Sequence, residues 1–181
     1  MPMKRGFPKA LSAPHQAGFS LLEILVAIVI VSLGLLGLAG LQAASLRNNQ
    51  LAYYRGIAAQ QVYDMADRIR ANQAGATAGN YDNLSATIPT DPGCFQTGCS
   101  VANMAVTDHS QWNTGNSRLL PGGVGTVTCV QGPGANCSNT PGALRVLRIL
   151  VRWPQTGTDC RDGAGTLLFA NTDCFIAEVS P

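Results

Sequence analysis

The chain of 181 residues has material for one ordinary domain with an appendage, but too little for two full-sized domains. Charged residues make up only 12% of it, about half the usual share, whereas 46% of its residues are hydrophobic. This composition, together with 20 Gly, 10 Pro and a small net charge of +2, argues against a coiled coil, a highly charged helical bundle and a basic nucleic-acid-binding surface.

The first eighteen residues carry an excess of positive charge. Both Lys residues of the chain, Lys4 and Lys9, lie there together with Arg5, and beyond this segment 9 basic residues face 10 acidic ones. Basic residues before an apolar run keep the N-terminus in the cytoplasm while the following chain is exported. We therefore expect residues 1–18 to form a cytoplasmic leader that starts at Met1 or at Met3.

An uncharged run of 23 residues extends from Ile24 to Leu46. As a helix it would span about 35 Å, enough to cross a hydrocarbon core of about 30 Å. It is longer than the apolar region of a secretory signal, which has about 7–15 residues, and a cleavage site after it is weak. The run therefore predicts a single membrane-spanning helix, with the rest of the chain on the exported side.

Glu23 places a carboxylate at the start of this segment. An intramembrane carboxylate costs about 3 kcal/mol, whereas the sixteen Leu, Ile, Val and Phe residues between Phe19 and Leu46 contribute about 7 kcal/mol to insertion. Insertion is thus expected despite Glu23, but a charge kept in the membrane implies a partner. If the chain were cut after Gly18, the new α-amine of Phe19 would supply one, within the same chain or between neighbouring chains.

This segment resembles the class III signal of type IV prepilins and of type II secretion pseudopilins, through Gly18-Phe19-Ser20-Leu21-Leu22-Glu23 followed by Ile24-Leu25-Val26-Ala27. The resemblance implies that a prepilin peptidase cuts between Gly18 and Phe19 and that Phe19 is N-methylated. It also implies that Glu23 guides docking into a growing filament. The alternative is a plain signal anchor in which Glu23 has no special role.

A second helical segment follows the apolar run. Gly34, Gly37 and Gly40 allow either close helix packing or local loosening of the first segment. Beyond them, apolar residues recur at steps of three and four, which predicts an amphipathic helix. We expect a transmembrane and assembly helix over 19–46 and an amphipathic helix over 47–73 that ends near Ala74-Gly75. The apolar stripe consists of Leu51, Tyr54, Ala58, Val62, Met65 and Ile69.

The remaining residues, 74–181, are expected to form an exported globular head. Strands with Gly and Pro turns after a long helix predict an α+β fold, in which the helix packs on an antiparallel sheet with disulfide-tied loops. A loop is expected at 76–80 and a turn at 119–125, and Met104 and Trp112 are expected in the core. The predicted helix is 102–112, and the predicted strands are 126–130, 144–153, 166–170 and 174–179.

All six cysteines lie in this head. An even number in a chain with an export-type N-terminus indicates disulfides in an oxidising compartment, whereas their spacing fits a zinc site poorly. Six cysteines allow 15 pairings, and the sequence does not choose among them. Pairing of nearest neighbours is the simplest hypothesis, which joins Cys94 to Cys99, Cys129 to Cys137 and Cys160 to Cys174.

The sequence offers little catalytic or metal-binding chemistry. His109 beside Asp108 does not make a catalytic geometry, and we expect it on a helix surface. Three acidic residues near Cys160 and Cys174 could bind Ca²⁺ or form a solvated loop, and three arginines make weak nucleic-acid evidence. We predict no enzyme, no metal and no cofactor. The acidic residues are Asp159, Asp162 and Asp173, and the arginines are Arg145, Arg148 and Arg152.

Three further segments resemble the PilV-type minor pilins, also called type IV pilus modification proteins. They are residues 33–42, residues 64–72 and Leu120-Pro121-Gly122-Gly123. The resemblance implies a low-abundance structural subunit in the inner membrane and then in a pilus, at its tip. The implied partners are other minor pilins, the major pilin, prepilin peptidase and the inner-membrane assembly platform, without nucleic acid. The alternatives are a minor pseudopilin of a type II secretion system and an anchored periplasmic enzyme or ligand-binding protein.

Overall fold

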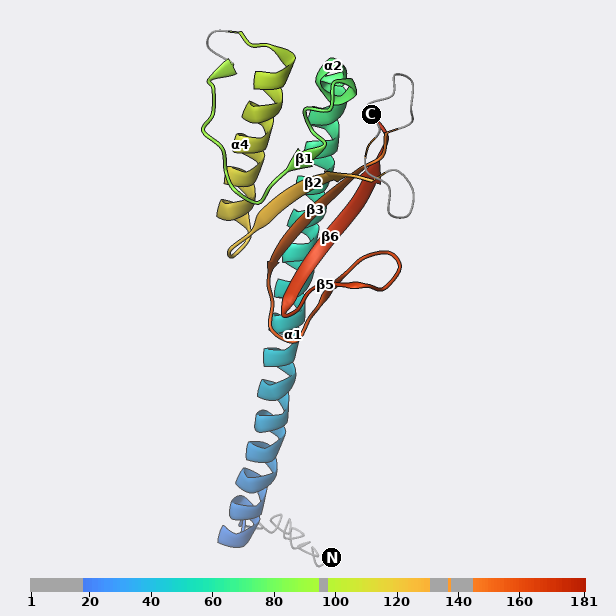
Figure 1. The fold of residues 1–181 in the computed structure, drawn as a ribbon. Coiled ribbons are helices and arrows are strands. Elements are labelled where there is room, and N and C mark those ends of the chain that lie inside the picture. Colours follow the sequence, from blue (N-terminus) through green and yellow to red (C-terminus); the bar gives the residue numbers. More distant parts are fainter. Residues whose placement is uncertain (1–17, 95–97, 131–136, 138–144) are drawn as a thin grey trace, which may run out of the picture. The chain divides into compact units, whose positions relative to one another are not determined.

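The computed structural model describes residues 18–94, 98–130, 137 and 145–181 (Figure 1). The chain divides into two compact units, Met1–Arg47 and Asn48–Pro181. The basic leader expected at residues 1–18 lies outside the described residues, except for Gly18. So does Leu144, which was expected to begin a strand.

The first helix, α1, runs from Leu21 to Ala71. Every residue from 18 to 50 is exposed, and this part of the helix is long and apolar enough to cross a membrane. The helix ends earlier than expected because Asn72 caps a new short helix, α2 (Gln73–Thr77), by accepting a hydrogen bond from the backbone N–H of Gly75 at 3.2 Å. The loop expected at 76–80 is therefore wrong in its first two residues, which belong to α2.

The part of α1 in the second unit is amphipathic, as its sequence predicts. Val62, Met65 and Ile69 are completely buried, whereas Gln60 and Asp64 on other faces are exposed. Leu51 and Tyr54, nearer the start of the stripe, are half-buried. The stripe becomes buried where the head packs against it, which is what a period of 3.6 residues requires of a helix with one partner.

The second long helix of the head, α4, spans Val101–Leu119 and is seven residues longer at its C-terminal end than expected. Ser100 caps its N-terminus, because its hydroxyl accepts a hydrogen bond from the backbone N–H of Asn103 at 3.2 Å. Trp112 is buried as predicted, and its Nε1–H donates to the carbonyl of Gln61 on α1 at 2.8 Å. Met104 is only half-buried, so the expectation that it belongs to the core is wrong.

The sheet has four antiparallel strands in the order β1-β2-β3-β6. Their bounds are β1 Asn83–Leu84, β2 Val124–Cys129, β3 Leu147–Pro154 and β6 Thr172–Val179. In β3 the predicted alternation is confirmed: Leu147, Ile149, Val151 and Trp153 are completely buried, whereas Arg148 and Arg152 lie on the opposite face. β1 was not predicted from the sequence, because a strand of two residues shows no recognisable alternation of apolar and polar side chains.

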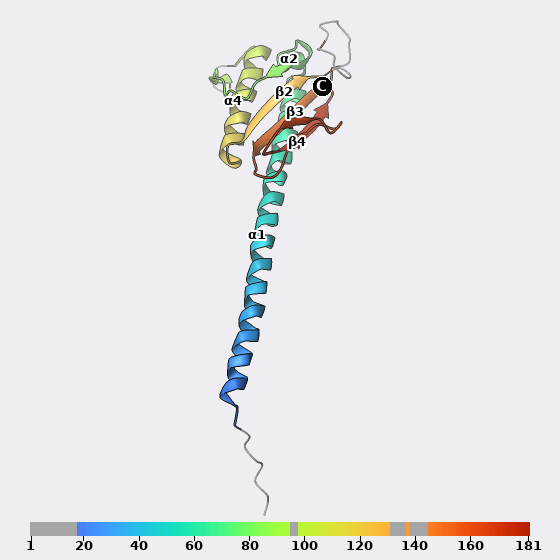
Figure 2. The same ribbon diagram turned by 60° about the horizontal axis from the view of Figure 1, so that its bottom comes forward.

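A separate hairpin of β4 (Cys160–Arg161) and β5 (Leu167–Phe169) lies on the β6 side of the sheet, while α4 lies on the β1–β2 side (Figure 2). Disulfides join Cys94 to Cys99, Cys129 to Cys137 and Cys160 to Cys174, which are the nearest-neighbour pairs. The last of them ties β4 to β6. β5 was predicted from the sequence, but its two-residue partner strand β4 was not.

A single hydrophobic core connects the helices and the sheet of the head. It contains Val62, Met65 and Ile69 of α1, Trp112 of α4, and the buried face of β3. The second unit is therefore an α+β domain in which a long helix packs on an antiparallel sheet with disulfide-tied loops. This arrangement confirms the fold class that the sequence predicts.

Candidate processing and assembly site

The peptide bond that the sequence predicts to be cut lies just before the first turn of α1. Residues 18–20 have no regular secondary structure and are exposed, Phe19 at 80%. Helical hydrogen bonding begins only at the carbonyl of Ser20, which accepts from the backbone N–H of Glu23 at 3.0 Å and of Ile24 at 3.3 Å. The bond between residues 18 and 19 is thus outside the helix and accessible, as the substrate segment of a peptidase must be.

Glu23 lies in the first turn of α1. Backbone N–H groups without a helical acceptor give this end of a helix a partial positive charge, which stabilises a carboxylate. The helix itself therefore lowers the cost of Glu23, a contribution that was not predicted from the sequence. Ser20 and Glu23 also have the spacing of a capping box, but neither side-chain hydrogen bond of that motif is found among the described residues.

Two polar side chains in the apolar half of α1 differ in how they are satisfied. The Ser32 hydroxyl donates to the carbonyl of Ile28 at 2.6 Å, so the helix satisfies this group internally. No hydrogen-bond or ion-pair partner of the Glu23 carboxylate is found in the part of the chain that the structure describes. In an apolar environment Glu23 therefore requires a partner from outside these residues, whereas Ser32 does not.

The apolar surface around Glu23 is extensive. Phe19, Leu22 and Leu25 are between 57% and 80% exposed, and further Leu, Ile and Val residues continue the exposed surface along the helix. Phe19, Glu23, Ala27 and Val31 follow one another at steps of four and so share one face. A surface of this kind is stable only in lipid or against other apolar helices.

In the head, a group of buried and half-buried titratable side chains connects α1 with α4. The Tyr81 hydroxyl donates to Asp108 Oδ2 at 2.6 Å and accepts from Asn72 Nδ2 at 3.0 Å, and Arg68 lies 3.3 Å from Asp108 Oδ1. Burial, and then the hydrogen bond with Asp108, raise the pKa of the Tyr81 hydroxyl well above its usual range. Each group is already paired inside the protein, so the cluster holds helices together and exposes no reactive atom.

His109 does not lie on a helix surface, and that expectation is wrong. Only 6% of it is exposed, and its Nε2 lies 2.8 Å from the carbonyl of Ser85 and 3.1 Å from Asn113 Nδ2. Burial lowers the pKa of His109, and the hydrogen bond with Ser85 opposes this only in part. Neutral imidazole that donates Nε2–H to the Ser85 carbonyl fits this environment. The helix is longer and more fully covered than its sequence suggested, which is why the residue is buried.

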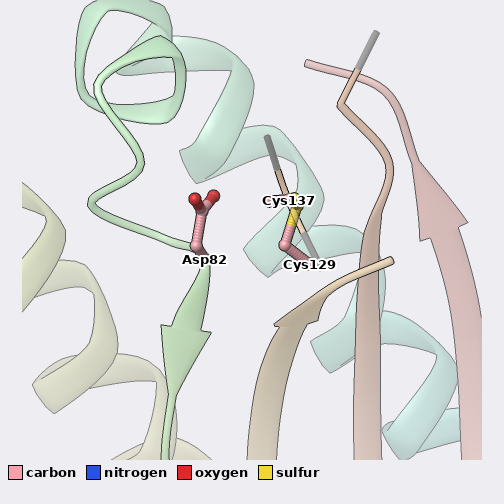
Figure 3. Close-up of side chains that lie close together, drawn as sticks. All are labelled: Asp82, Cys129 and Cys137. Carbon is pink, nitrogen blue, oxygen red and sulfur yellow. A yellow bond between two sulfur atoms is a disulfide. The ribbon is translucent and has the colours of Figure 1, made fainter. Parts of the chain in front are cut away.

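Asp82, Cys129 and Cys137 are the one group of possible metal ligands found within the described residues, and Figure 3 shows them together. Their ligand atoms lie within 4.8 Å of one another. The two cysteines are joined in a disulfide, however, and Asp82 Oδ2 accepts from Arg145. A metal would need thiolates and an uncommitted carboxylate, so this arrangement is a disulfide beside an ion pair.

The acidic residues considered for Ca²⁺ binding have separate partners. Asp173 is buried and accepts from Arg55 Nε at 2.9 Å. Asp162 accepts from the backbone N–H groups of Thr166 and Ala164 at 2.8 and 3.0 Å, and Asp159 accepts from that of Asn171 at 3.2 Å. They stabilise turns and the contact of α1 with β6, and their carboxylates do not converge on one point.

The arginines considered for nucleic-acid binding also differ from one another. Arg145 pairs with Asp82, and Arg148 pairs with Glu178 at 2.9 Å. Arg152 has no carboxylate partner and lies over the ring of Phe169. They therefore do not form a continuous basic strip.

Comparison with known proteins gives one match. The family described as the prokaryotic N-terminal methylation motif matches residues 14–39. No curated protein and no solved structure matches the chain.

The matched residues include Gly18, Phe19 and Glu23 and more than half of the apolar run. The match, the exposed bond before α1 and the apolar helix together support a protein of the type IV pilin and pseudopilin class. Such a protein is a substrate of prepilin peptidase and is anchored in the membrane by its N-terminal helix.

Proposed function

We propose that this chain is a minor pilin of the PilV type, a structural subunit needed to assemble or initiate a type IV pilus. The observation that carries the proposal is the arrangement at the start of α1. An accessible bond between Gly18 and Phe19 is followed, within one helical turn, by Glu23 and then by an exposed apolar helix. The segments 33–42, 64–72 and 120–123, which resemble minor pilins, support the choice of type.

The chemistry of this site explains how assembly would be driven. Cleavage after Gly18 frees a positively charged α-amine on Phe19, which remains charged after N-methylation. In a bundle of such helices, Glu23 of one subunit pairs with the amine of a neighbour, so that two unpartnered charges in an apolar environment satisfy each other. The exposed Leu, Ile and Val side chains then pack helix against helix. The pair sets the register of the subunit, and the apolar surface supplies most of the contact area.

The proposed organisation follows from this mechanism. Residues 1–18 are the leader, 19–46 the membrane and assembly helix, 47–73 its amphipathic continuation and 74–181 the exported head. The subunit waits in the inner membrane with its head in the periplasm and then enters the pilus, at or near the tip. Its partners are other minor pilins, the major pilin, prepilin peptidase and the inner-membrane assembly platform. The head acts by presenting a surface, without catalysis or a cofactor.

Mass spectrometry of the mature N-terminus tests the class. We expect a chain that begins with N-methylated Phe19. A mature protein that retains the basic leader would contradict the proposal. Recovery of the protein with sheared pili from a strain without a type II secretion system distinguishes a pilin from a pseudopilin.

Replacing Glu23 by Ala tests the role of the carboxylate. We expect Glu23→Ala to insert into the membrane, since the substitution removes an insertion cost of about 3 kcal/mol, but not to enter pili. Ser32→Ala is the matched control. It also removes a polar group from α1, but the hydroxyl of Ser32 already bonds to a carbonyl of the same helix and needs no partner from a neighbour. Immunoblots of membrane and pilus fractions give the result. Normal incorporation of Glu23→Ala would show that the site has another role.

A further inference from the structure

Arg152 occupies an unusual position in the head. It lies on β3, between Val124 of β2 and Cys174 of β6, on the face of the sheet opposite to the core residues Val151 and Trp153. Its side chain is half-buried, and its Nε is fully buried without a hydrogen-bond partner. A buried donor that has lost water and gained no acceptor is destabilising, so this group needs an explanation.

No carboxylate of the chain neutralises Arg152. All ten acidic side chains lie within the described residues, and none of them is within ion-pair distance of it. Two other described arginines, Arg47 and Arg118, lack an ion pair, but both are exposed to solvent. The described arginines that do form ion pairs are Arg55, Arg68, Arg70, Arg145, Arg148 and Arg161.

Exposed apolar side chains lie beside this charge. The guanidinium carbon of Arg152 lies 4.3 Å from the ring centroid of Phe169, which is 38% exposed. Leu167, which is 48% exposed, lies on the same face of β5 as Phe169 because strand residues alternate. The disulfide between Cys160 and Cys174 ties this hairpin to β6. Arginine and aromatic residues are enriched in protein interfaces, and arginine is among the residues that contribute most to binding there.

We propose that Arg152, Phe169 and Leu167 form a docking surface for a second protein that presents an Asp or Glu side chain beside an apolar one. The incoming carboxylate pairs with the guanidinium from the solvent side of this half-buried side chain, and it accepts from the guanidinium as none of the described residues does. The apolar neighbour covers Leu167 and the free part of the Phe169 ring, which removes water from the pair and strengthens it. This surface belongs to the head alone and is separate from the assembly contacts proposed for α1.

A protein fits this surface better than an anionic membrane does. Binding to anionic lipid relies on several Lys or Arg side chains near one another. Here a single uncompensated cation on β3 is accompanied by Asp162 of the β4–β5 hairpin, while Asp159 and Arg161 beside it pair with each other. The charge of Asp162 would repel an anionic membrane surface, whereas one carboxylate of a partner needs only Arg152.

Photo-crosslinking in the host cells tests the proposal with the full chain. The photoreactive residue p-benzoylphenylalanine replaces Leu167, and the crosslinked peptide is identified by mass spectrometry. We expect a peptide of another protein that contains Asp or Glu next to an apolar residue. Arg152→Glu should lower the crosslink yield at least about tenfold, and Arg152→Lys should retain part of it, because the charge remains while the planar stack is lost.

Two controls distinguish loss of the proposed contact from a general effect of the charge change or from misfolding of the head. Arg118→Glu makes the same charge change at an exposed site at the end of α4 and should leave the yield unchanged. Replacing the partner's crosslinked carboxylate by Arg should restore the yield with Arg152→Glu, which a misfolded head could not do. No crosslink, a crosslink to lipid alone, or a yield that ignores Arg152→Glu would overturn the proposal. N-methylation of Phe19 in each variant separates this outcome from a failure of the proposed pilin function.

Discussion

His109 couples the stability of the head to pH. Its imidazole is buried against Ser85 and Asn113, and burial lowers its pKa below the usual value of 6.5. The unfolded chain therefore binds a proton at a higher pH than the folded chain does. The contribution of neutral His109 to the free energy of unfolding is therefore fully present above about pH 6.5. It is lost as the pH falls from there toward the lower pKa of the folded state. Hydrogen bonds from backbone N–H groups lower the pKa of Asp91 and Asp162 below 3.8, so these carboxylates titrate at more acidic pH.

We predict that the free energy of unfolding falls between pH 7.5 and pH 5.5. Because His109 takes up one proton, the free energy of unfolding can change by at most about 1.4 kcal/mol per pH unit through this group. His109→Gln keeps a donor for the Ser85 carbonyl and should remove most of the dependence. Urea titrations of the full chain in detergent, followed by tryptophan fluorescence, measure this. An equal fall with pH in His109→Gln would show that other groups are responsible.

The Tyr81 hydroxyl connects Asp108 of α4 with Asn72, the residue that follows α1 and caps α2. It is completely buried and bonded to Asp108 and Asn72, so Tyr81→Phe leaves a buried carboxylate oxygen without its closest donor. We predict a loss of about 1.5–3 kcal/mol in the free energy of unfolding. Tyr63→Phe is the matched control, because Tyr63 is 60% exposed, and it should change stability by less than about 0.5 kcal/mol. Similar losses in both variants would contradict the role given to Tyr81.

At the scale of elements, the side chain of Asn113 hydrogen-bonds α4 to β2. The Asn113 amide accepts from the backbone N–H of Gly125 at 2.6 Å and donates to its carbonyl at 3.0 Å, as a neighbouring strand would. A Cβ on Gly125 would overlap the Trp112 ring and approach the Asn116 amide. The helix and the strand can approach this closely only because the strand residue is glycine.

We predict that Gly125→Ala destabilises the head by about 1–3 kcal/mol, since it forces Trp112 and β2 apart. Gly163→Ala is the matched control, because a Cβ there meets no atom within 4 Å. The unfolding midpoint in urea, read from tryptophan fluorescence, should fall for the first variant and stay within about 0.5 kcal/mol of wild type for the second. A stable Gly125→Ala protein would mean that α4 and β2 are less tightly packed than their contacts indicate.

The same elements explain which parts of the fold could be predicted. β3 was predictable because one face is buried, which imposes an alternation of apolar and polar residues on its sequence. The second half of α4 was not predictable, because Asn113 and Asn116 are polar residues that are buried there. Asn113 bonds to Gly125 of β2, and Asn116 bonds to Asn113, which a helical pattern of apolar residues does not reveal. β1 and β4 have two residues each and form only because β2 and β5 lie beside them.

At the scale of the whole molecule, the two units differ in how much of them the sequence predicts. The candidate residues of the first unit, Met1–Arg47, are recognised by composition and local spacing, so Gly18, Phe19 and Glu23 could be selected as candidates from the sequence alone. The docking surface at Arg152 could not, because it depends on the absence of a carboxylate near one arginine and on the position of Phe169. A motif of adjacent residues can be read from the sequence. The lack of a carboxylate near Arg152 can be recognised only from the folded structure, because it depends on residues that are far apart in the chain.

This division predicts that changes in one unit leave the other intact. Both tryptophans of the chain, Trp112 and Trp153, lie in the head, so their fluorescence reports on that unit alone. Glu23→Ala should change the free energy of unfolding of the head by less than about 0.5 kcal/mol, because Glu23 belongs to the other compact unit and makes no hydrogen bond or ion pair among the described residues. Conversely, Tyr81→Phe should leave N-methylation of Phe19 unchanged. A head that loses stability with Glu23→Ala would show that the assembly carboxylate also supports folding, and the two units would not be independent.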